Sequence, residues 1–245
     1  MATLKAKLGL PDKYNVLVVA AHPDDETIGL GGTLNRMAFE GGLNLYVVFV
    51  TDGVSSRAPK GMSARETMAR NALHELVQRD IDDPKLLDDR MCNTLRCDFW
   101  GMKDQALCSL NVAKLATLLN QAVQVIRPFV IFTHYAGDLN ADHRVVAEAT
   151  RIATQDTPHP LRLLLAYPTW SSTEHAFSPF VPNFFVTLSE ESIVAKTRAI
   201  KQYHTEVRGD HSPRSPSCLL SRAVVDGSNI RSRFAEGFQL IRAAL

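Results

Sequence analysis

Short apolar runs alternate with amphipathic stretches along most of this chain. Each run stops at turn-forming or charged residues, a pattern typical of strands buried on both faces of a sheet. On this basis we predict strands over residues 16–21, 45–50, 96–101, 129–133, 161–166 and 184–188.

Between these runs, apolar residues recur with the spacing of a helix. The pattern is clearest over 111–126, where Arg127 and Pro128 end it. Residues 208–218 are rich in Pro, Ser and Arg and are predicted to be a mobile loop. The predicted helices span residues 25–39, 63–79, 111–126, 145–154, 190–203 and 234–244.

Strands that alternate with helices predict the α/β class. The first strand, helix and second strand are joined by short links, which predicts a right-handed parallel unit. Parallel strands end at the same edge of a sheet, and ligands in such folds bind at that edge. No linker or composition shift divides the chain, so we expect residues 1–245 to form a single domain.

The end of the first predicted strand carries unusual chemistry. His22-Pro23-Asp24-Asp25-Glu26 follows directly on the apolar run. Pro23 favours an extended conformation at His22, so the strand leads straight into the polar cluster. These side chains are types that bind metals or transfer protons. They are equally compatible with a simple acidic N-terminus of the helix that follows.

The glycine-rich stretch that follows resembles a dinucleotide-binding fingerprint only superficially. Leu34 occupies the position of the third glycine, and acids stand where a pyrophosphate needs positive potential. Close packing of the helix on the sheet is the better explanation of glycines 29, 31 and 32.

A second cluster follows the predicted strand 129–133. It contains His134, Asp138, Asp142 and His143. If this strand neighbours the first one, the two clusters meet at one edge of the sheet. Two histidines and one carboxylate with an open position form a catalytic zinc arrangement. The alternative is that the two clusters are separately capped loops.

Charge and composition exclude several classes of function. The formal net charge is +1, which favours neither nucleic acid nor an anionic membrane as a partner. No apolar run approaches the roughly 20 residues of a membrane span, and the N-terminus lacks the apolar core of a signal peptide. The four cysteines form no CxxC pair, so we expect free thiols in a reducing cytoplasm.

The hexapeptide 21–26, Ala-His-Pro-Asp-Asp-Glu, together with Asp142-His143 resembles the PIG-L/LmbE-like deacetylases. Members of this family are zinc-dependent amide hydrolases that remove N-acetyl groups from sugars such as N-acetylglucosamine derivatives. The resemblance runs from Val16 to His143 and continues more weakly in 196–206 and 234–242. It implies a Rossmann-like, mostly parallel sheet with helices on both faces.

The family motif transfers residue by residue to this sequence. The resemblance implies that His22, Asp25 and His143 bind Zn²⁺ and that Asp24 is the general base. It further implies that Asp142 orients a neighbouring imidazole. A zinc ion lowers the pKa of its water to about 7 and polarises the amide carbonyl, which is why the chemistry needs these residue types.

The chain departs from the family pattern at one position. Many members have a histidine two residues before the downstream aspartate, where this sequence has Asn140. Asparagine can donate a hydrogen bond but cannot protonate an amine. The asparagine form also resembles known relatives, so we expect activity to be retained. His134, His175 or His211 could supply the proton instead.

The remaining substrate-binding candidates are drawn from loops and helix starts near the two clusters. The simplest interpretation of Arg65 is a residue on a solvated helix face, but we also keep it as a candidate for substrate binding. The loops 55–62 and 170–183 are expected to shape the pocket, because loops on a rigid scaffold usually carry specificity. The full set of candidates is Arg65, Asp104, His134, Asp138, His175 and His211.

The sequence therefore predicts a cytoplasmic, zinc-dependent N-deacetylase that acts on an N-acetylated amino sugar or its conjugate. A second copy of the chain, in a homo-oligomer, is kept as a candidate partner. Two alternatives stay open. One is a zinc amidase that acts on a different amide, for example a sugar–thiol conjugate. The other is a non-catalytic ligand-binding α/β protein whose acids only cap a helix.

Overall fold

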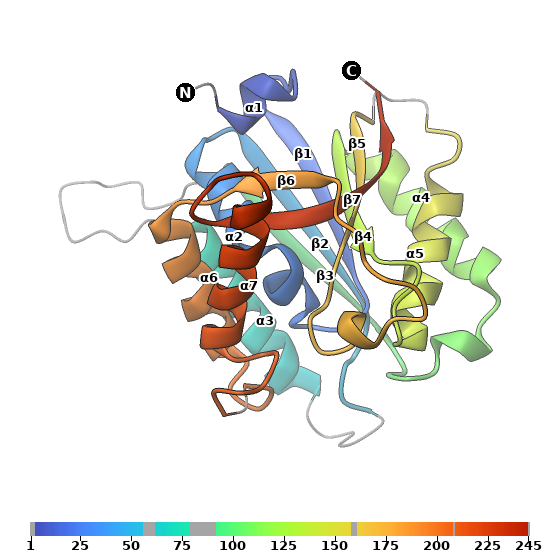
Figure 1. Cartoon of the computed structure of the whole chain (residues 1–245). Helices are drawn as coiled ribbons and strands as arrows, with labels where there is room; N and C mark the ends of the chain where they lie inside the picture. The colour runs from blue at the N-terminus through green and yellow to red at the C-terminus, as the bar shows by residue number, and fades with distance from the viewer. Residues whose placement is uncertain (1–2, 56–61, 79–91, 158–160, 208, 245) are drawn as a thin grey trace.

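A seven-stranded sheet in the order β3-β2-β1-β4-β5-β7-β6 lies at the centre of the computed structural model (Figure 1). The structure describes residues 3–55, 62–78, 92–157, 161–207 and 209–244. Neighbouring strands from β3 to β5 run parallel, whereas β7 is antiparallel to β5 and to β6. The strands are β1 Tyr14–Ala20, β2 Leu43–Thr51, β3 Thr94–Met102, β4 Val130–His134, β5 Leu163–Tyr167, β6 Phe184–Thr187 and β7 Ala235–Ala243.

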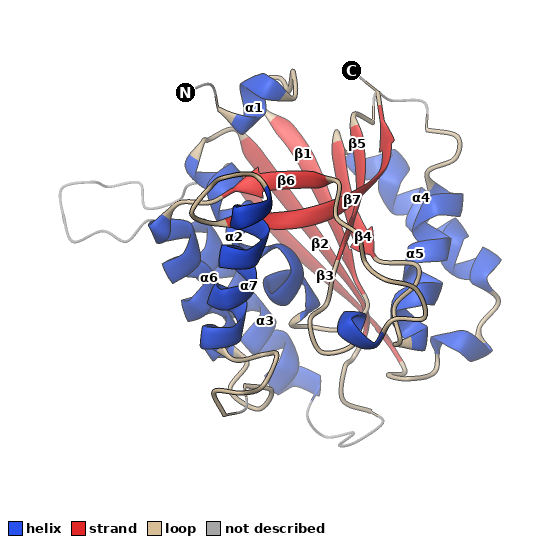
Figure 2. Ribbon diagram, in the orientation of Figure 1, coloured by secondary structure: helices blue, strands red, loops and turns tan. Residues whose placement is uncertain are grey.

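Helices cover both faces of this sheet (Figure 2). Helices α4 and α5 pack together on one face, and α2, α3, α6 and α7 lie on the other. The predicted fold class, a mostly parallel α/β sheet between helices, is confirmed. The helices are α1 Leu4–Lys7, α2 Asp25–Phe39, α3 Met62–Val77, α4 Val112–Ile126, α5 Ala141–Ala153, α6 Glu190–Gln202 and α7 Pro216–Asn229, with short 3₁₀ turns at Leu107–Ser109 and Thr173–His175.

From Val16 to Ala20, strand β1 is apolar without interruption because both of its faces are buried there. Val16 and Val18 pack into the core beneath α2, α3 and α6. Leu17 and Val19 point the other way, into the core beneath α4 and α5. All four side chains have no exposed surface, so β1 and the loop that follows it rest on a rigid base.

The predicted C-terminal helix over 234–244 is wrong. These residues form β7, which pairs with β5 on one side and β6 on the other. Two partner strands satisfy the backbone of this segment, and tertiary pairing of this kind overrides a local helical preference.

The predicted mobile loop over 208–218 is also partly wrong. Helix α7 begins at Pro216, and the Ser215 hydroxyl accepts a hydrogen bond from the Cys218 N–H at 3.2 Å. A serine cap followed by proline in the first turn is a recognisable helix start. Residues 56–61 of the predicted pocket loop and residue 79, the end of one predicted helix, lie outside the described residues.

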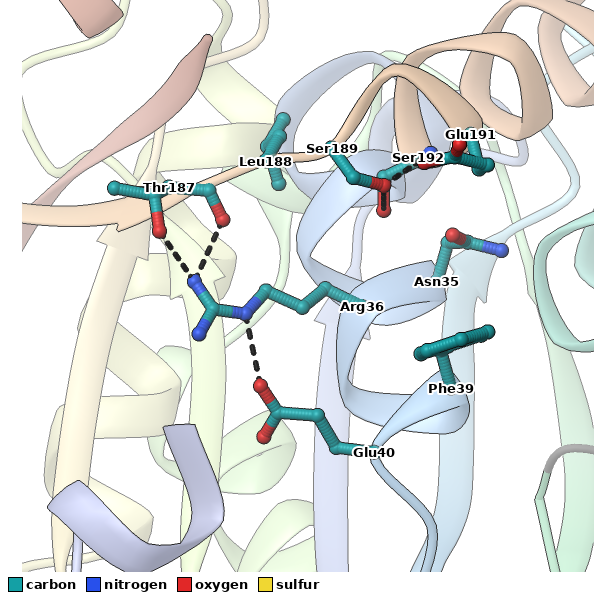
Figure 3. Close-up of a pocket in the computed structure, with 9 residues that line it drawn as sticks. All are labelled: Asn35, Arg36, Phe39, Glu40, Thr187, Leu188, Ser189, Glu191 and Ser192. Atoms are coloured by element: carbon teal, nitrogen blue, oxygen red, sulfur yellow. Dashed lines mark hydrogen bonds and ion pairs between the residues drawn. The ribbon is translucent and has the colours of Figure 1, made fainter. Parts of the chain in front are cut away.

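A cavity of about 390 Å³ opens between the C-terminal part of α2 and the connection from β6 to α6 (Figure 3). Arg36 crosses it and donates to the Thr187 carbonyl and to Glu40. The cavity therefore lies at the opposite end of α2 from Asp25. Across the described part of the chain, no helix is both long and apolar enough to cross a membrane.

Candidate active site

The loops after β1 and β4 meet at the carboxyl edge of the sheet. The two strands are direct neighbours, with Val16 opposite Val130 and Val18 opposite Phe132. This pairing brings the two predicted clusters together, and the ring centres of His22 and His143 lie 5.2 Å apart. The condition under which the two clusters meet, that their strands are neighbours, is therefore fulfilled.

Three potential ligand atoms converge at this point: His22 Nδ1, Asp25 Oδ2 and His143 Nε2. The two nitrogens are 3.2 Å apart, and the carboxylate oxygen is 3.3 Å from the first and 3.4 Å from the second. A tetrahedral zinc site with bonds of about 2.0–2.1 Å has edges about 1.6 times longer, or roughly 3.3 Å. The spacing of these three atoms fits such an ion and leaves a fourth position open.

Each of these imidazoles is held by carboxylates on its far side. His22 Nε2 lies 3.1 Å from Asp104 and 3.2 Å from Asp142, and Asp142 also accepts two backbone N–H groups from the loop after β3. His143 Nδ1 lies 3.3 Å from Asp138. A carboxylate partner fixes the proton on the far nitrogen, so the near nitrogen presents its lone pair to a metal.

We expect Asp138→Asn to weaken metal binding about 10–100-fold, the usual effect of losing a partner of a ligating histidine. Asparagine has almost the same shape but no charge to hold the His143 N–H. A competition titration with a chelating dye measures this affinity. Asp98→Asn, at an exposed carboxylate paired with Arg96 on β3, is the matched control. Unchanged affinity in Asp138→Asn would remove Asp138 from this role.

His134 lies behind the cluster. Its Nε2 accepts the Ala21 N–H at 2.8 Å, so this nitrogen carries no proton. Burial, followed by the neighbouring His143, lowers the pKa of His134 to about 4. The ring stacks on His143 at 4.0 Å and is 1% exposed. Support of a ligand fits His134 better than contact with substrate.

Asp24 stands at the N-terminus of α2 with an unusual backbone conformation, φ 126° and ψ −24°. Its Oδ2 lies 3.1 Å from Arg214 Nη1 and 3.3 Å from Arg65 Nη2. Burial raises the pKa of Asp24, and the two guanidinium groups act in the opposite direction. The cations therefore help to keep this buried side chain a carboxylate, the form a base requires.

The strain at Asp24 has a direct consequence for stability. A positive φ of this kind costs a residue with a side chain about 1–3 kcal/mol, whereas glycine tolerates it. We therefore expect Asp24→Gly to unfold at higher urea concentration than Asp24→Ala. Both variants lose the same carboxylate, so their difference isolates the backbone. Equal stability would mean that the conformation costs nothing.

Both arginines are tied to Glu206 as well. Arg65 Nη1 lies 3.1 Å from Glu206 Oε1, and Arg214 Nη1 lies 2.7 Å from Glu206 Oε2. The interpretation of Arg65 as a solvated residue is wrong, because only 2% of it is exposed. The local sequence pattern did not indicate Arg214, which comes from the segment expected to be a loop. The only available signal was that so many buried acids require nearby cations.

Asn140 is the N-cap of α5. Its Oδ1 accepts the Asp142 N–H at 2.9 Å, and its own N–H donates to Asp138 at 2.8 Å. The side-chain oxygen is thus engaged in the cap, and the amide N–H₂ is the group that remains to contact a substrate.

We expect Asn140→Asp and Asn140→Ala to differ. Aspartate keeps the cap and loses the donor, so stability should hold while transition-state stabilisation falls by about 1–3 kcal/mol. Alanine loses both, with an additional cost in unfolding free energy of about 0.5–2 kcal/mol. Kinetics and urea denaturation on the same samples separate the two effects. A native rate in Asn140→Asp would leave the cap as the residue's only role.

The other predicted site residues divide into two groups. Asp104 joins the buried cluster through His22, although it was a candidate for substrate binding. His175 and His211 are exposed. In the described part of the chain they belong neither to the group His22, Asp25 and His143 nor to the other possible metal-binding group, His22, Asp104 and Asp142.

The sequence and the fold both have known relatives. The family model described as PIG-L: GlcNAc-PI de-N-acetylase matches residues 17–154. The chain is 25% identical over 191 residues to Uncharacterized deacetylase YaiS of Escherichia coli, covering 78% of this chain and 91% of that protein. It is 27% identical over 146 residues to Probable N-acetyl-alpha-D-glucosaminyl L-malate deacetylase 2 of Bacillus subtilis, covering 56% and 59%.

The fold is similar to that of a solved structure, the conserved protein TT1542 from Thermus thermophilus. The TM-score is 0.71 at 25% identity, with 95% of this chain and 96% of that chain covered. The family match spans both clusters of the candidate site, from the loop after β1 to the start of α5.

Proposed function

This chain belongs to the PIG-L family of deacetylases, and on that premise we propose that it is a zinc-dependent hydrolase that removes the N-acetyl group from an amino sugar or its conjugate. The observation that carries the proposal is the spacing of His22 Nδ1, Asp25 Oδ2 and His143 Nε2. Asp24 immediately precedes one of these ligands in the chain, and its buried carboxylate is the proposed base for an attacking water.

In this proposal His22, Asp25 and His143 hold the metal. When bound, zinc acidifies water and polarises an amide carbonyl. Asp24 takes the proton of the attacking water. Because Asp24 then carries a proton, it can deliver that proton to the nitrogen of the leaving amine.

The position of the other candidate acids supports this double role for Asp24. His134 accepts the Ala21 N–H through Nε2, so this nitrogen has no proton to give. Asn140 has no acidic proton at all, but its N–H₂ can donate a hydrogen bond to the reacting amide. We assign Asn140 to that hydrogen bond.

The sugar part of the proposal follows from the relatives. The family description names GlcNAc-PI as the substrate, and the Bacillus subtilis relative is named for an N-acetyl-alpha-D-glucosaminyl L-malate. Both names contain an N-acetylglucosamine unit. We infer that this chain takes the same unit, attached to a partner group of its own.

The test is an acetate-release assay with added zinc over N-acetylated sugars, sugar nucleotides and glycosides. Acetate together with a new amine supports the proposal. A new amine without acetate would indicate a zinc amidase for another acyl group. If protein that contains metal releases neither acetate nor a new amine from any substrate in the panel, the result favours a non-catalytic ligand-binding protein.

A further inference from the structure

The backbone at Asp24 needs an explanation of its own. Residues other than glycine rarely adopt φ near 126°, and such conformations persist only when the surroundings hold them. The Asp24 side chain makes no capping bond to α2. Something other than Asp24 itself must therefore fix this residue at the start of the helix.

The side chain of Glu26 contacts the backbone of Asp24 directly. Its Oε2 accepts the backbone N–H of Asp24 at 3.1 Å. On the other side of the residue, the Asp24 carbonyl accepts the N–H groups of Thr27 and Ile28 at 3.1 and 2.9 Å, as expected in a first helical turn. Asp24 is therefore bound at both of its backbone polar groups.

Glu26 is in turn held from two sides. Its Oε1 accepts the Thr27 hydroxyl at 2.6 Å and the Tyr203 hydroxyl at 2.7 Å. Tyr203 ends α6, far away in sequence, and the Arg65 guanidinium lies 5.4 Å from the centre of its ring. Arg65 also pairs with the Asp24 carboxylate, so the same group of residues contacts both the backbone and the side chain of Asp24.

We propose that Glu26 is a positioning residue that holds Asp24 in the strained conformation its role as a base requires. The proposal rests on the function proposed for Asp24 above. Glu26 has no exposed surface. Burial of a carboxyl group costs free energy that its hydrogen bonds must offset, so a carboxyl group at this position indicates a role for those hydrogen bonds. An apolar residue of the same size would suit the site if packing were its only task.

The experiment compares Glu26→Gln with Glu26→Met. Glutamine can turn its oxygen toward the Asp24 N–H, and its N–H₂ can donate to the Thr27 and Tyr203 hydroxyls. Methionine has a similar volume and no oxygen acceptor. We expect Glu26→Gln to keep kcat within about threefold. A base displaced by about 1 Å loses about a hundredfold in rate, so Glu26→Met should lower kcat by about 10–100-fold.

Three further measurements distinguish positioning from general stability. Metal content should remain at one ion per chain, and KM should change less than kcat. The Asp24 amide should exchange with solvent at least about tenfold faster in Glu26→Met than in the parent protein or in Glu26→Gln. Glu26→Asp keeps the charge and withdraws the acceptor by one methylene, so it should show the same loss as Glu26→Met. It provides the test if Glu26→Met folds poorly.

The results separate this inference from the proposed function. Absence of acetate release by the parent protein, with the exchange pattern as expected, would overturn the function and keep the positioning contact. A native kcat in Glu26→Met or Glu26→Asp, in an active enzyme, would overturn the inference alone. An equal loss in Glu26→Gln and Glu26→Met would also overturn it, because charge and not the hydrogen bond would then be the cause.

Discussion

Asp24→Asn should retain its metal and lose about 10²–10⁴-fold in the rate of acetate release, the range for removal of a positioned base. Asparagine matches aspartate in shape, so the proposed ligands His22, Asp25 and His143 should stay in place. It cannot accept the proton of the attacking water. Glu206 still neutralises part of the charge on Arg65 and Arg214, so the variant should fold.

The same change at a half-buried carboxylate outside the candidate site gives the control. Asp226 lies on α7, where its Oδ2 accepts the Gly237 N–H at 2.9 Å. Asp226→Asn should leave both metal content and rate close to native. Near-native hydrolysis by Asp24→Asn, with zinc bound, would exclude Asp24 as the base.

The centre of the site could be predicted because its residues follow buried strands. The apolar run before His22 and the one before His134 are local patterns, and parallel strands end at one edge. What the pattern left open was whether β1 and β4 are neighbours, which the structure confirms. The sequence pattern places the two clusters at one edge of the sheet. It cannot predict that the three proposed ligand atoms lie 3.2–3.4 Å from one another, because that spacing depends on how the side chains pack.

Residues that reach the site from far away in sequence were harder to predict. Asp104 follows β3, and its partner is the far nitrogen of His22, a relation that exists only once the imidazole has an orientation. Arg214 lies in a Pro- and Ser-rich segment whose composition indicates a loop. Its pairing with Asp24 reflects the need to balance buried charge, which is a property of the whole cluster.

Glu26 shows a different limit. It belongs to the hexapeptide that identifies the family, yet its residue type assigned it no role of its own among the acids of that cluster. Its contact with the Asp24 N–H suggests a role only because Asp24 has a positive φ, and this backbone angle cannot be inferred from residue types. The strand β7 illustrates the same point at a larger scale, because its partners β5 and β6 decide its conformation.

Removal of a metal ligand should have the most complete effect of all. We expect His22→Ala and His143→Ala each to lose bound zinc and, with it, measurable acetate release. Each leaves two protein ligands where a catalytic zinc site uses three. Elemental analysis of protein purified without chelator measures the metal, and His74→Ala, an exposed histidine on α3, is the control for the substitution itself.

The metal-free protein should also bind zinc more weakly as pH falls. Burial opposes the charged form of His22 and His143, but the carboxylates around them outweigh it and raise the pKa of both. Protons therefore compete with the metal for the same nitrogens, and binding must release them. A zinc titration at several pH values should show affinity rising with pH and proton release on binding.

The zinc content of the alanine variants decides the ligand assignment itself. If both His22→Ala and His143→Ala keep a full complement of zinc, these histidines are not its ligands.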